Sequence, residues 1–265
     1  METREEHLKR AVEAWEQLTE DRVNLYLNKY YSLDRESVLP NIAPLSVDRG
    51  LECIFIEGEL RGMKQNFYVA CKLFVASQQE AKPSGDVFAD YAPFLYGLLS
   101  DSPEIYDWLA HVELKDKDYV KGAHFLFHQF QLAMQRDDEA LREAIALVAK
   151  KGGNRDKALA QAGQDFFSLL LKQDKVGLQA MIEGQAKIKS AHELEGQFLA
   201  GFAVIHAKLC WYRGIEVQIQ NPLVPMPLMP IQPLDAYDVE YDFLRPGWMP
   251  PPPPGLLAKV KRLFS

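Results

Sequence analysis

The 265-residue sequence contains little cysteine, no long hydrophobic run and no excess of positive charge. Its cysteines, Cys53, Cys71 and Cys210, are too few and too widely spaced for the disulfide framework of a small secreted domain, and they favour a reducing compartment. The most apolar stretch, residues 199–212, includes a histidine and a lysine and is shorter than the roughly 20 apolar residues of a membrane span. We therefore expect no membrane-spanning helix.

The charges of the sequence argue against a nucleic-acid-binding protein and against a secreted one. A net charge of −7 makes sequence-independent binding to nucleic acid unfavourable, because that affinity comes mainly from Lys and Arg on phosphates. Residues 1–20 are highly charged and lack the apolar core of a secretory signal. We expect a cytoplasmic protein, and an acidic chain is suited to a basic partner.

Motifs of catalysis are also missing. The sequence has no Gly-x-Ser-x-Gly elbow, no glycine-rich phosphate loop and no dinucleotide fingerprint. Paired carboxylates such as Glu57 and Glu59 are two residues apart, a spacing that points them away from each other on a helix. We therefore expect no enzyme and no catalytic residue.

A metal site is the one chemical alternative. His124 and His128 are four residues apart on an expected helix, as are His206 and Cys210, and the two pairs together could supply four ligands. Each pair lies in an apolar, core-like context without a third ligand nearby in the sequence. We expect no metal and no cofactor, and a metal-dependent helical enzyme is the third-ranked hypothesis.

Helical periodicity dominates the first half of the chain. Apolar residues recur near the 3.6-residue period of an amphipathic helix, and prolines and glycines separate the helical stretches. Expected helices cover residues 4–31, 47–77, 86–99 and 103–111. The second is one helix, or two joined between Gly58 and Gly62. A turn is expected at residues 83–85, and Ser102 is expected to be the N-cap of the helix over residues 103–111.

The second half contains an internal repeat. An offset of 37 residues aligns Asp137 with Asp174 and Phe130 with Phe167. Each copy is an apolar helix, a polar turn and a second helix that the Asp of the turn can cap, with residues 151–154 as the connector between copies. This pattern predicts packed antiparallel helical hairpins, followed by a last helix over residues 191–213.

Alternating segments come after the last helix. Residues 215–219 and 239–243 both alternate apolar and polar side chains, as half-buried strands do, and a proline-rich segment separates them. The predicted fold is therefore mainly α, of packed antiparallel helical hairpins with a small two-stranded β ribbon and an extended proline-rich C-terminal segment.

The proline content changes sharply along the chain, since most of the 16 prolines lie between Pro222 and Pro254. We expect residues 1–244 to form one α-helical domain, and residues 245–265 to form a proline-rich tail with a short basic amphipathic helix. That helix could bind an anionic membrane or a partner groove, but packing on its own protein is favoured because so short a helix is marginal alone.

Acidic residues are concentrated in two places. Residues 101–118 hold six acids against two lysines, and residues 235–242 hold four acids among two tyrosines and no base. Acids steer a basic partner while tyrosines supply contact area, so the second group predicts a protein-binding surface; the alternative is a solvated ribbon edge. The candidate binding residues are Asp235, Tyr237, Asp238, Glu240, Tyr241 and Asp242, with the first acidic group as an extension.

Three segments near the C-terminus carry a family resemblance. GFAVIHAKLCWYRGIEV (residues 201–217), NPLVPMPLM (221–229) and YDFL (241–244) resemble the C-terminal part of the immunity 49 family of bacterial polymorphic-toxin systems. Those proteins likewise end in an alanine-rich helix, an Arg-Gly turn, a short extended segment and a proline-rich stretch. The proline-rich extension and basic helix after residue 244 lie outside this pattern.

The resemblance implies an immunity protein that binds a cognate toxin in the producing cell and neutralises it through a protein interface, without catalysis. The toxin is expected to be basic and to contact residues 235–242. The alternative is a helical-repeat scaffold or adaptor whose proline-rich tail docks on another protein, and the sequence leaves the oligomeric state, including a homodimer, open.

Overall fold

A computed structural model of the chain describes residues 2–31, 35–80, 88–188 and 193–252. These residues form helices and extended segments, and none of them forms a strand. The prediction of a mainly α fold is therefore confirmed, whereas the predicted β ribbon is wrong. No described helix has the length and apolarity needed to cross a membrane.

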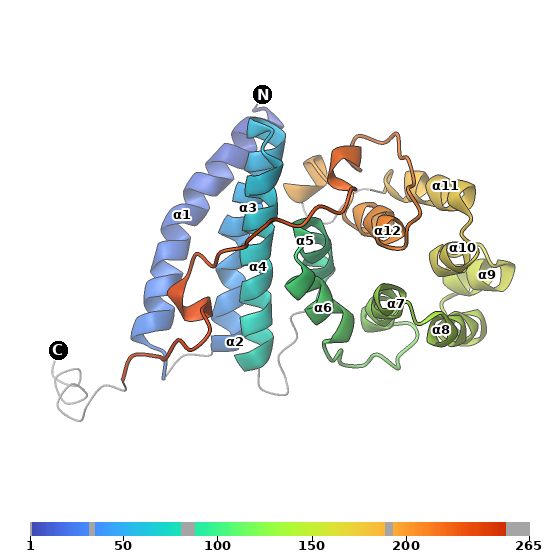
Figure 1. Cartoon of the computed structure of the whole chain (residues 1–265), viewed down its shortest axis with the longest axis horizontal. Coiled ribbons are helices and arrows are strands. Elements are labelled where there is room, and N and C mark those ends of the chain that lie inside the picture. Colours follow the sequence, from blue (N-terminus) through green and yellow to red (C-terminus); the bar gives the residue numbers. More distant parts are fainter. Residues whose placement is uncertain (1, 32–34, 81–87, 189–192, 253–265) are drawn as a thin grey trace.

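The first part of the chain is a layer of long helices (Figure 1). It contains α1 (Arg4–Asn28), α2 (Arg35–Val38), the 3-10 turn Leu39–Asn41, α3 (Ala43–Glu52), the π-helical turn Cys53–Glu57 and α4 (Leu60–Glu80). The joint expected between Gly58 and Gly62 is present, and Gly58 adopts the left-handed φ of 72° that glycine allows without a steric penalty.

Two short helices, α5 (Ala92–Ser100) and α6 (Pro103–His111), lie at the centre of the molecule. Helix α6 has the predicted bounds, and the hydroxyl of Ser102 accepts a hydrogen bond from the Ile105 amide, as expected of an N-cap. Helix α5 begins later than predicted, with Pro93 in its first turn. The turn predicted at residues 83–85 lies outside the described residues.

The remaining helices form the other end of the molecule: α7 (Ala123–Gln135), α8 (Asp138–Lys151), α9 (Asn154–Ala162), α10 (Phe166–Leu171), α11 (Lys175–Gln185) and α12 (Gly201–Tyr212). Asp137 and Asp174 cap α8 and α11, as the repeat predicts. The aligned Phe130 and Phe167 contact each other, with ring centroids 5.8 Å apart. Both copies therefore have the predicted cap, and α9 is an additional helix that the pattern does not indicate.

The last helix is shorter than predicted. Instead of beginning near residue 191, α12 begins at Gly201 after the short 3-10 turn Glu195–Gln197. Residues 189–192 lie outside the described part of the chain. Helix α12 is buried along most of its length, as expected for the most apolar stretch of the sequence.

The two alternating segments do not pair with each other because helix side chains bind their backbone groups. The amide of Gln218 donates to Gln179 of α11 at 3.1 Å, and the amide of Gln220 donates to Glu183. The Gln65 side chain of α4 binds both the amide and the carbonyl of Asp238, at 3.2 and 2.6 Å. A ribbon partner is therefore unnecessary to satisfy these groups.

Residues 230–248, here called the arm, cross the molecule from α12 over α5 and α4 to α1 (Figure 1). The segment before them includes the 3-10 turn Met226–Leu228, and the arm includes a second, Asp242–Leu244. At its far end, Phe243 and Trp248 pack on Tyr26 of α1, with ring centroids 4.8 and 6.3 Å away. The basic amphipathic helix expected after residue 254 lies outside the described residues.

Candidate protein-binding surface

Side chains alternate along the arm although it is not a strand. Its apolar and aromatic side chains between Tyr237 and Trp248 pack against the core, whereas its acidic side chains are exposed. Asp238 and Asp242 have side-chain exposures of 82% and 86%. Extended backbone produces this period of two without sheet pairing. We call the exposed residues Asp235, Asp238, Glu240 and Asp242 the acidic edge.

The two tyrosines among these acids face inward and anchor the arm. Tyr237 packs on Tyr68 of α4 at a centroid distance of 4.8 Å, and its hydroxyl donates to the Ser100 carbonyl at 2.7 Å. Tyr241 stacks on Phe243 at 5.2 Å. Both tyrosines are partly buried, so their main contacts are with this chain and the acids provide the outward chemistry.

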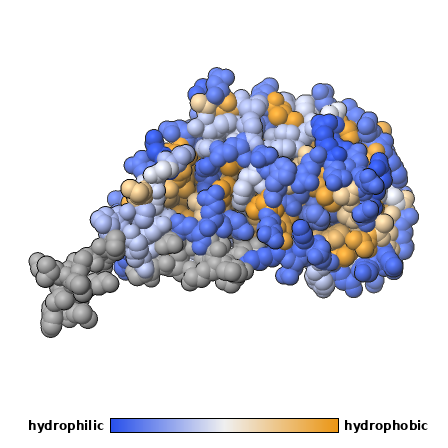
Figure 2. Space-filling view, turned by 60° about the horizontal axis from the view of Figure 1, so that its bottom comes forward, coloured by the Kyte–Doolittle hydropathy of each residue, from blue (hydrophilic) through white to orange (hydrophobic). Residues whose placement is uncertain are grey.

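Two arginines partly offset the charge of the acidic edge. Arg49 of α3 bridges Glu240 and Glu16 at 3.1 and 3.2 Å, and Arg245 contacts Asp242 at 3.1 Å. Arg245 also lies 3.8 Å from Asp238. These are exposed ion pairs, which contribute little stability and are readily exchanged for a partner's cations. Figure 2 shows one face of the molecule, on which hydrophilic residues predominate and hydrophobic patches are interspersed.

In the first acidic group, residues 101–118, two of the six acids are buried or already paired, whereas Asp107, Glu113, Asp116 and Asp118 are exposed. Asp101 is fully buried and cannot contact a partner. Glu104 pairs with Lys72 at 2.6 Å and accepts a hydrogen bond from Tyr68. The ring of Tyr68 packs against that of Tyr237. Glu104 therefore lies beside the arm, but its charge is already paired.

A buried ionic cluster holds the start of the arm in place. Asp101 accepts hydrogen-bonded ion pairs from Lys64 of α4 at 2.8 Å and from Lys208 of α12 at 2.6 Å. All three side chains are at most 3% exposed. The hydroxyl of Tyr212 also donates to Asp101, at 3.2 Å. Burial lowers the pKa of Lys208 to about 8, against the opposing effect of Asp101.

The same lysines bind backbone carbonyls of the proline-rich segment. Lys208 donates to the carbonyls of Leu228, Met229 and Pro230 at 2.8, 3.2 and 3.3 Å. Lys64 donates to the Gln232 carbonyl at 2.6 Å, and the Gln232 amide donates to Asp101 at 3.1 Å. Prolines have carbonyls but no N–H, so such a segment has excess acceptors. Buried ammonium groups supply the missing donors.

Sequence reasoning missed this cluster, although one signal was present. Lys208 interrupts the most apolar stretch of the chain, and a fully buried lysine requires a partner. The sequence does not indicate which partners Lys208 has. They are Asp101, far earlier in the chain, and the carbonyls of residues 228–230, which follow the helix.

A second buried acidic site lies between α3 and the turn before α12. Glu195 accepts hydrogen bonds from the hydroxyls of Tyr91, at 2.8 Å, and Tyr96. Asp48 of α3 is 7% exposed, and burial, with the nearby Glu195 charge as a smaller cause, raises its pKa to about 7. Asp48 is therefore a carboxyl group that titrates near neutral pH.

This titration predicts a pH-dependent stability difference for Asp48→Asn. An unfolded Asp loses its proton near pH 4 and the folded Asp48 near pH 7, so between these values unfolding releases a proton. The native protein therefore loses stability relative to the variant as pH rises, by up to about 1.4 kcal/mol per pH unit, and the difference levels off above pH 7. Urea unfolding from pH 4 to 8, with the exposed Asp21→Asn as control, measures it. A pH-independent difference would contradict the assignment.

Two of the four residues of the metal hypothesis, His124 and His206, have other partners, and His128 lies edge-on to the Phe125 ring at a centroid distance of 6.5 Å. His124 contacts the Phe88 carbonyl at 3.2 Å, and His206 bonds Gln185 at 2.6 Å. Cys210 is buried, which raises its thiol pKa to about 12. Within the described residues, no three of His124, His128, His206 and Cys210 bring their ligand atoms together.

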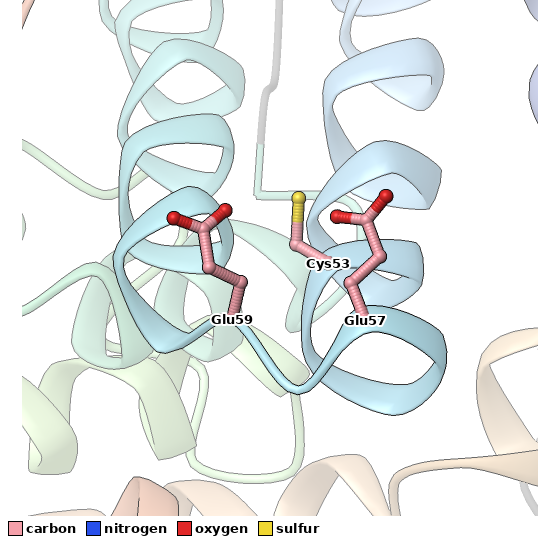
Figure 3. Close-up of side chains that lie close together, drawn as sticks. All are labelled: Cys53, Glu57 and Glu59. Atoms are coloured by element: carbon pink, nitrogen blue, oxygen red, sulfur yellow. The ribbon is translucent and has the colours of Figure 1, made fainter.

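A different trio of potential ligands is brought together. The ligand atoms of Cys53, Glu57 and Glu59 lie within 4.8 Å of one another at the joint between α3 and α4 (Figure 3). Burial, reinforced by Glu57, raises the pKa of the Cys53 thiol to about 11, so the thiol is protonated at neutral pH. Both glutamates are exposed. We assign no ion to this trio.

The chain was compared with protein-family models, curated proteins and solved structures, and none of them matches it.

Proposed function

We propose that this chain is an immunity protein that binds a basic bacterial toxin through the acidic edge of the arm and neutralises it by occupying its surface. The observation that carries the proposal is the arrangement of the arm, with four acids directed outward and its aromatic side chains directed inward. The sequence resemblance to the immunity 49 family supplies the class of partner.

The placement of the acidic edge supports binding by electrostatic complementarity. Asp235, Asp238, Glu240 and Asp242 stand against one base of the arm, Arg245, which leaves an excess of negative charge over a short segment. Acids fixed in position attract a basic surface and set its orientation, with smaller losses of conformational freedom than a flexible acidic tail would incur.

The buried cluster supports the rigidity that this mode of binding requires. Lys64 and Lys208 hold the backbone where the arm begins, and Phe243 and Trp248 hold its far end on α1. The acidic edge lies between these two attachments. Contacts at both ends therefore limit how far the acids can move when a partner approaches.

Co-expression tests the proposed function. A toxin encoded beside the gene for this chain should stop growth of a bacterial host when expressed alone, and growth should be restored when this chain is present. A toxin that stops growth equally with and without this chain would overturn the proposal and favour the scaffold hypothesis, in which the protein binds partners without protecting the cell.

A further inference from the structure

A cavity of about 980 Å³ opens between α7, α9, α10 and α11. These helices form the end of the molecule opposite α1, whereas the acidic edge runs over α4 toward α1 (Figure 1). The cavity is therefore a feature separate from the proposed toxin-binding surface. Its size lies within the range of small-molecule sites.

The walls of the cavity are mainly aromatic and aliphatic. They come from both copies of the helical repeat and from the additional helix α9, so no single hairpin could form the cavity alone. Such walls favour the apolar and aromatic parts of a ligand over water. The main apolar side chains are Phe125, Leu126, Leu159, Phe166, Met181 and Ile188.

Gln129 of α7 brings a polar side chain into this apolar wall. It follows Phe125 and Leu126 by one helical turn, on the face of α7 that lines the cavity. The residue is only 5% exposed, and its side-chain amide forms no hydrogen bond with any residue that the structure describes. The amide is therefore an unpartnered polar group that is more than nine-tenths buried.

The Gln129 amide is open to the cavity and not sealed inside the protein. In the described part of the chain, the sealed side-chain atoms without a hydrogen-bond partner belong to Thr19, Ser46, Gln78, His128, His206 and Tyr241. The oxygen and nitrogen of the Gln129 amide also lack a partner but are not among these atoms, so they retain accessible surface. Because Gln129 belongs to the cavity lining, a molecule in the cavity can reach them.

Gln185 of α11 adds a second open amide group to the lining. Burial lowers the pKa of His206 to about 3, so its ring is neutral, and Nδ1–H donates to Oε1 of Gln185 at 2.6 Å. This hydrogen bond orients the Gln185 amide and leaves its Nε2 as a donor. Among the described residues that nitrogen has no partner, and it is not sealed.

The chemistry of a side-chain amide indicates what Gln129 can recognise. An amide has an acceptor oxygen beside N–H donors, so it can form two parallel hydrogen bonds with a group that has an N–H next to a carbonyl. Glutamine binds the edge of a flat base in this two-point way. Water can also hydrogen-bond the amide, but a flat ring that carries such an edge makes the same bonds and contacts the aromatic walls as well.

The charges around the cavity favour an uncharged ligand. Lys121 and Arg155 line it together with Asp156, Asp165 and Asp174. Two of these acids are already used, since Asp165 caps α10 and Asp174 caps α11. The remaining charges of both signs leave no strong preference for an anion or a cation.

We infer that this cavity binds an uncharged aromatic lactam, whose adjacent N–H and carbonyl form two hydrogen bonds with the side-chain amide of Gln129. The aromatic and aliphatic walls contact the ring, and the two-point pairing sets its orientation. Nε2 of Gln185 supplies a further donor within the same cavity. This inference does not depend on the proposed toxin binding, which involves other residues.

Quinolin-2-one and 1-methylquinolin-2-one form a matched pair of probes, because the methyl group removes the N–H donor and keeps the rings and the carbonyl. Titration calorimetry should show quinolin-2-one binding about tenfold more tightly to the native protein, the effect of one hydrogen bond to a buried acceptor. Equal affinities of the two probes for the native protein would overturn the inference.

Substitution of Gln129 assigns this difference to one side chain. Gln129→Leu keeps the size of the side chain and removes an unpartnered polar group from an apolar wall, so the fold should be retained. The two probes should bind this variant equally. Gln161→Leu makes the same change at an exposed glutamine of α9 outside the cavity lining and should keep the native difference. A native difference that persists in Gln129→Leu would overturn the inference.

Filling the cavity provides the next arm of the experiment. Leu126→Trp should weaken the binding of quinolin-2-one by about tenfold or more, because the larger ring takes the space of the ligand. Leu147→Trp, at a residue 40% exposed on α8 and outside the cavity lining, should not change it. Unchanged binding to Leu126→Trp would overturn the inference.

The side-chain amide signals of Gln129 give a readout that needs no folded variant. In the NMR spectrum of the native protein, quinolin-2-one must shift the ¹H and ¹⁵N signals of this amide, because it replaces water as the hydrogen-bond partner. Signals that stay in place at a saturating concentration of quinolin-2-one would overturn the inference.

Discussion

Replacing Asp101 with asparagine should lower the free energy of unfolding by about 3–5 kcal/mol, the cost of removing one partner from a buried ion pair. Lys64 and Lys208 would remain buried with no carboxylate between them. The substitution isolates the charge, because asparagine has nearly the same shape and tolerates the left-handed φ of 55° that Asp101 adopts at the end of α5. Urea denaturation measures the loss.

Two comparisons make this result specific. Asp118→Asn removes an exposed carboxylate and should change stability by less than about 0.5 kcal/mol. Because the cluster positions the start of the arm, Asp101→Asn should also increase hydrogen exchange of the Gln232 amide, which donates to Asp101. A stability loss below about 1 kcal/mol would show that the cluster does not hold the arm.

Charge reversal of the acidic edge should have the second large effect. Asp235→Lys, Asp238→Lys and Asp242→Lys together should raise the Kd for the basic toxin at least 100-fold, because three attractions become three repulsions and like-charge contacts cost several kcal/mol. The three side chains are exposed, so the fold should be retained. Glu240 is left in place because it pairs with Arg49 of α3.

A matched control separates local from general electrostatics. Glu139→Lys, Glu143→Lys and Asp156→Lys reverse three exposed acids on α8 and α9 and change the net charge by the same amount. This control variant should keep the native Kd within about threefold at physiological salt, since screening weakens distant charges. Equal losses of affinity in both variants would mean that net charge, and not the acidic edge, determines binding.

Local signals predicted the helix caps well. Ser102, Asp137 and Asp174 were identified as caps from their positions before helical stretches, and each accepts the expected backbone hydrogen bond. Capping depends on residues within one turn, so a single sequence contains the necessary information. Helix α9 was missed because its short, polar sequence resembles a connector.

The β ribbon was predicted wrongly for a non-local reason. The period of two at residues 215–219 and 239–243 correctly predicted extended backbone with one buried side, but it could not say what would bind the exposed amides and carbonyls. Side chains of Gln65, Gln179 and Glu183 bind them. Backbone amides and carbonyls of an extended segment can be bound either by helix side chains or by a partner strand. The alternation of apolar and polar residues is the same with either partner, so it does not distinguish them.

The candidate surface was predictable in part. The sequence analysis assigned both the acids and the tyrosines of residues 235–242 to the binding surface, and of these the acids are exposed whereas Tyr237 and Tyr241 are partly buried. The inward role of Tyr237 depends on the Ser100 carbonyl and on Tyr68, and the burial of Asp101 depends on two lysines from different helices. Such contacts follow from tertiary packing, which composition and spacing do not specify.

Growth of a bacterial host that carries the toxin gene encoded beside this chain tests the central claim most directly. With the toxin induced, the native chain and the control variant Glu139→Lys/Glu143→Lys/Asp156→Lys should both restore growth. The variant Asp235→Lys/Asp238→Lys/Asp242→Lys, present at the same level with native helical circular dichroism, should not. Full protection by that variant would contradict the account.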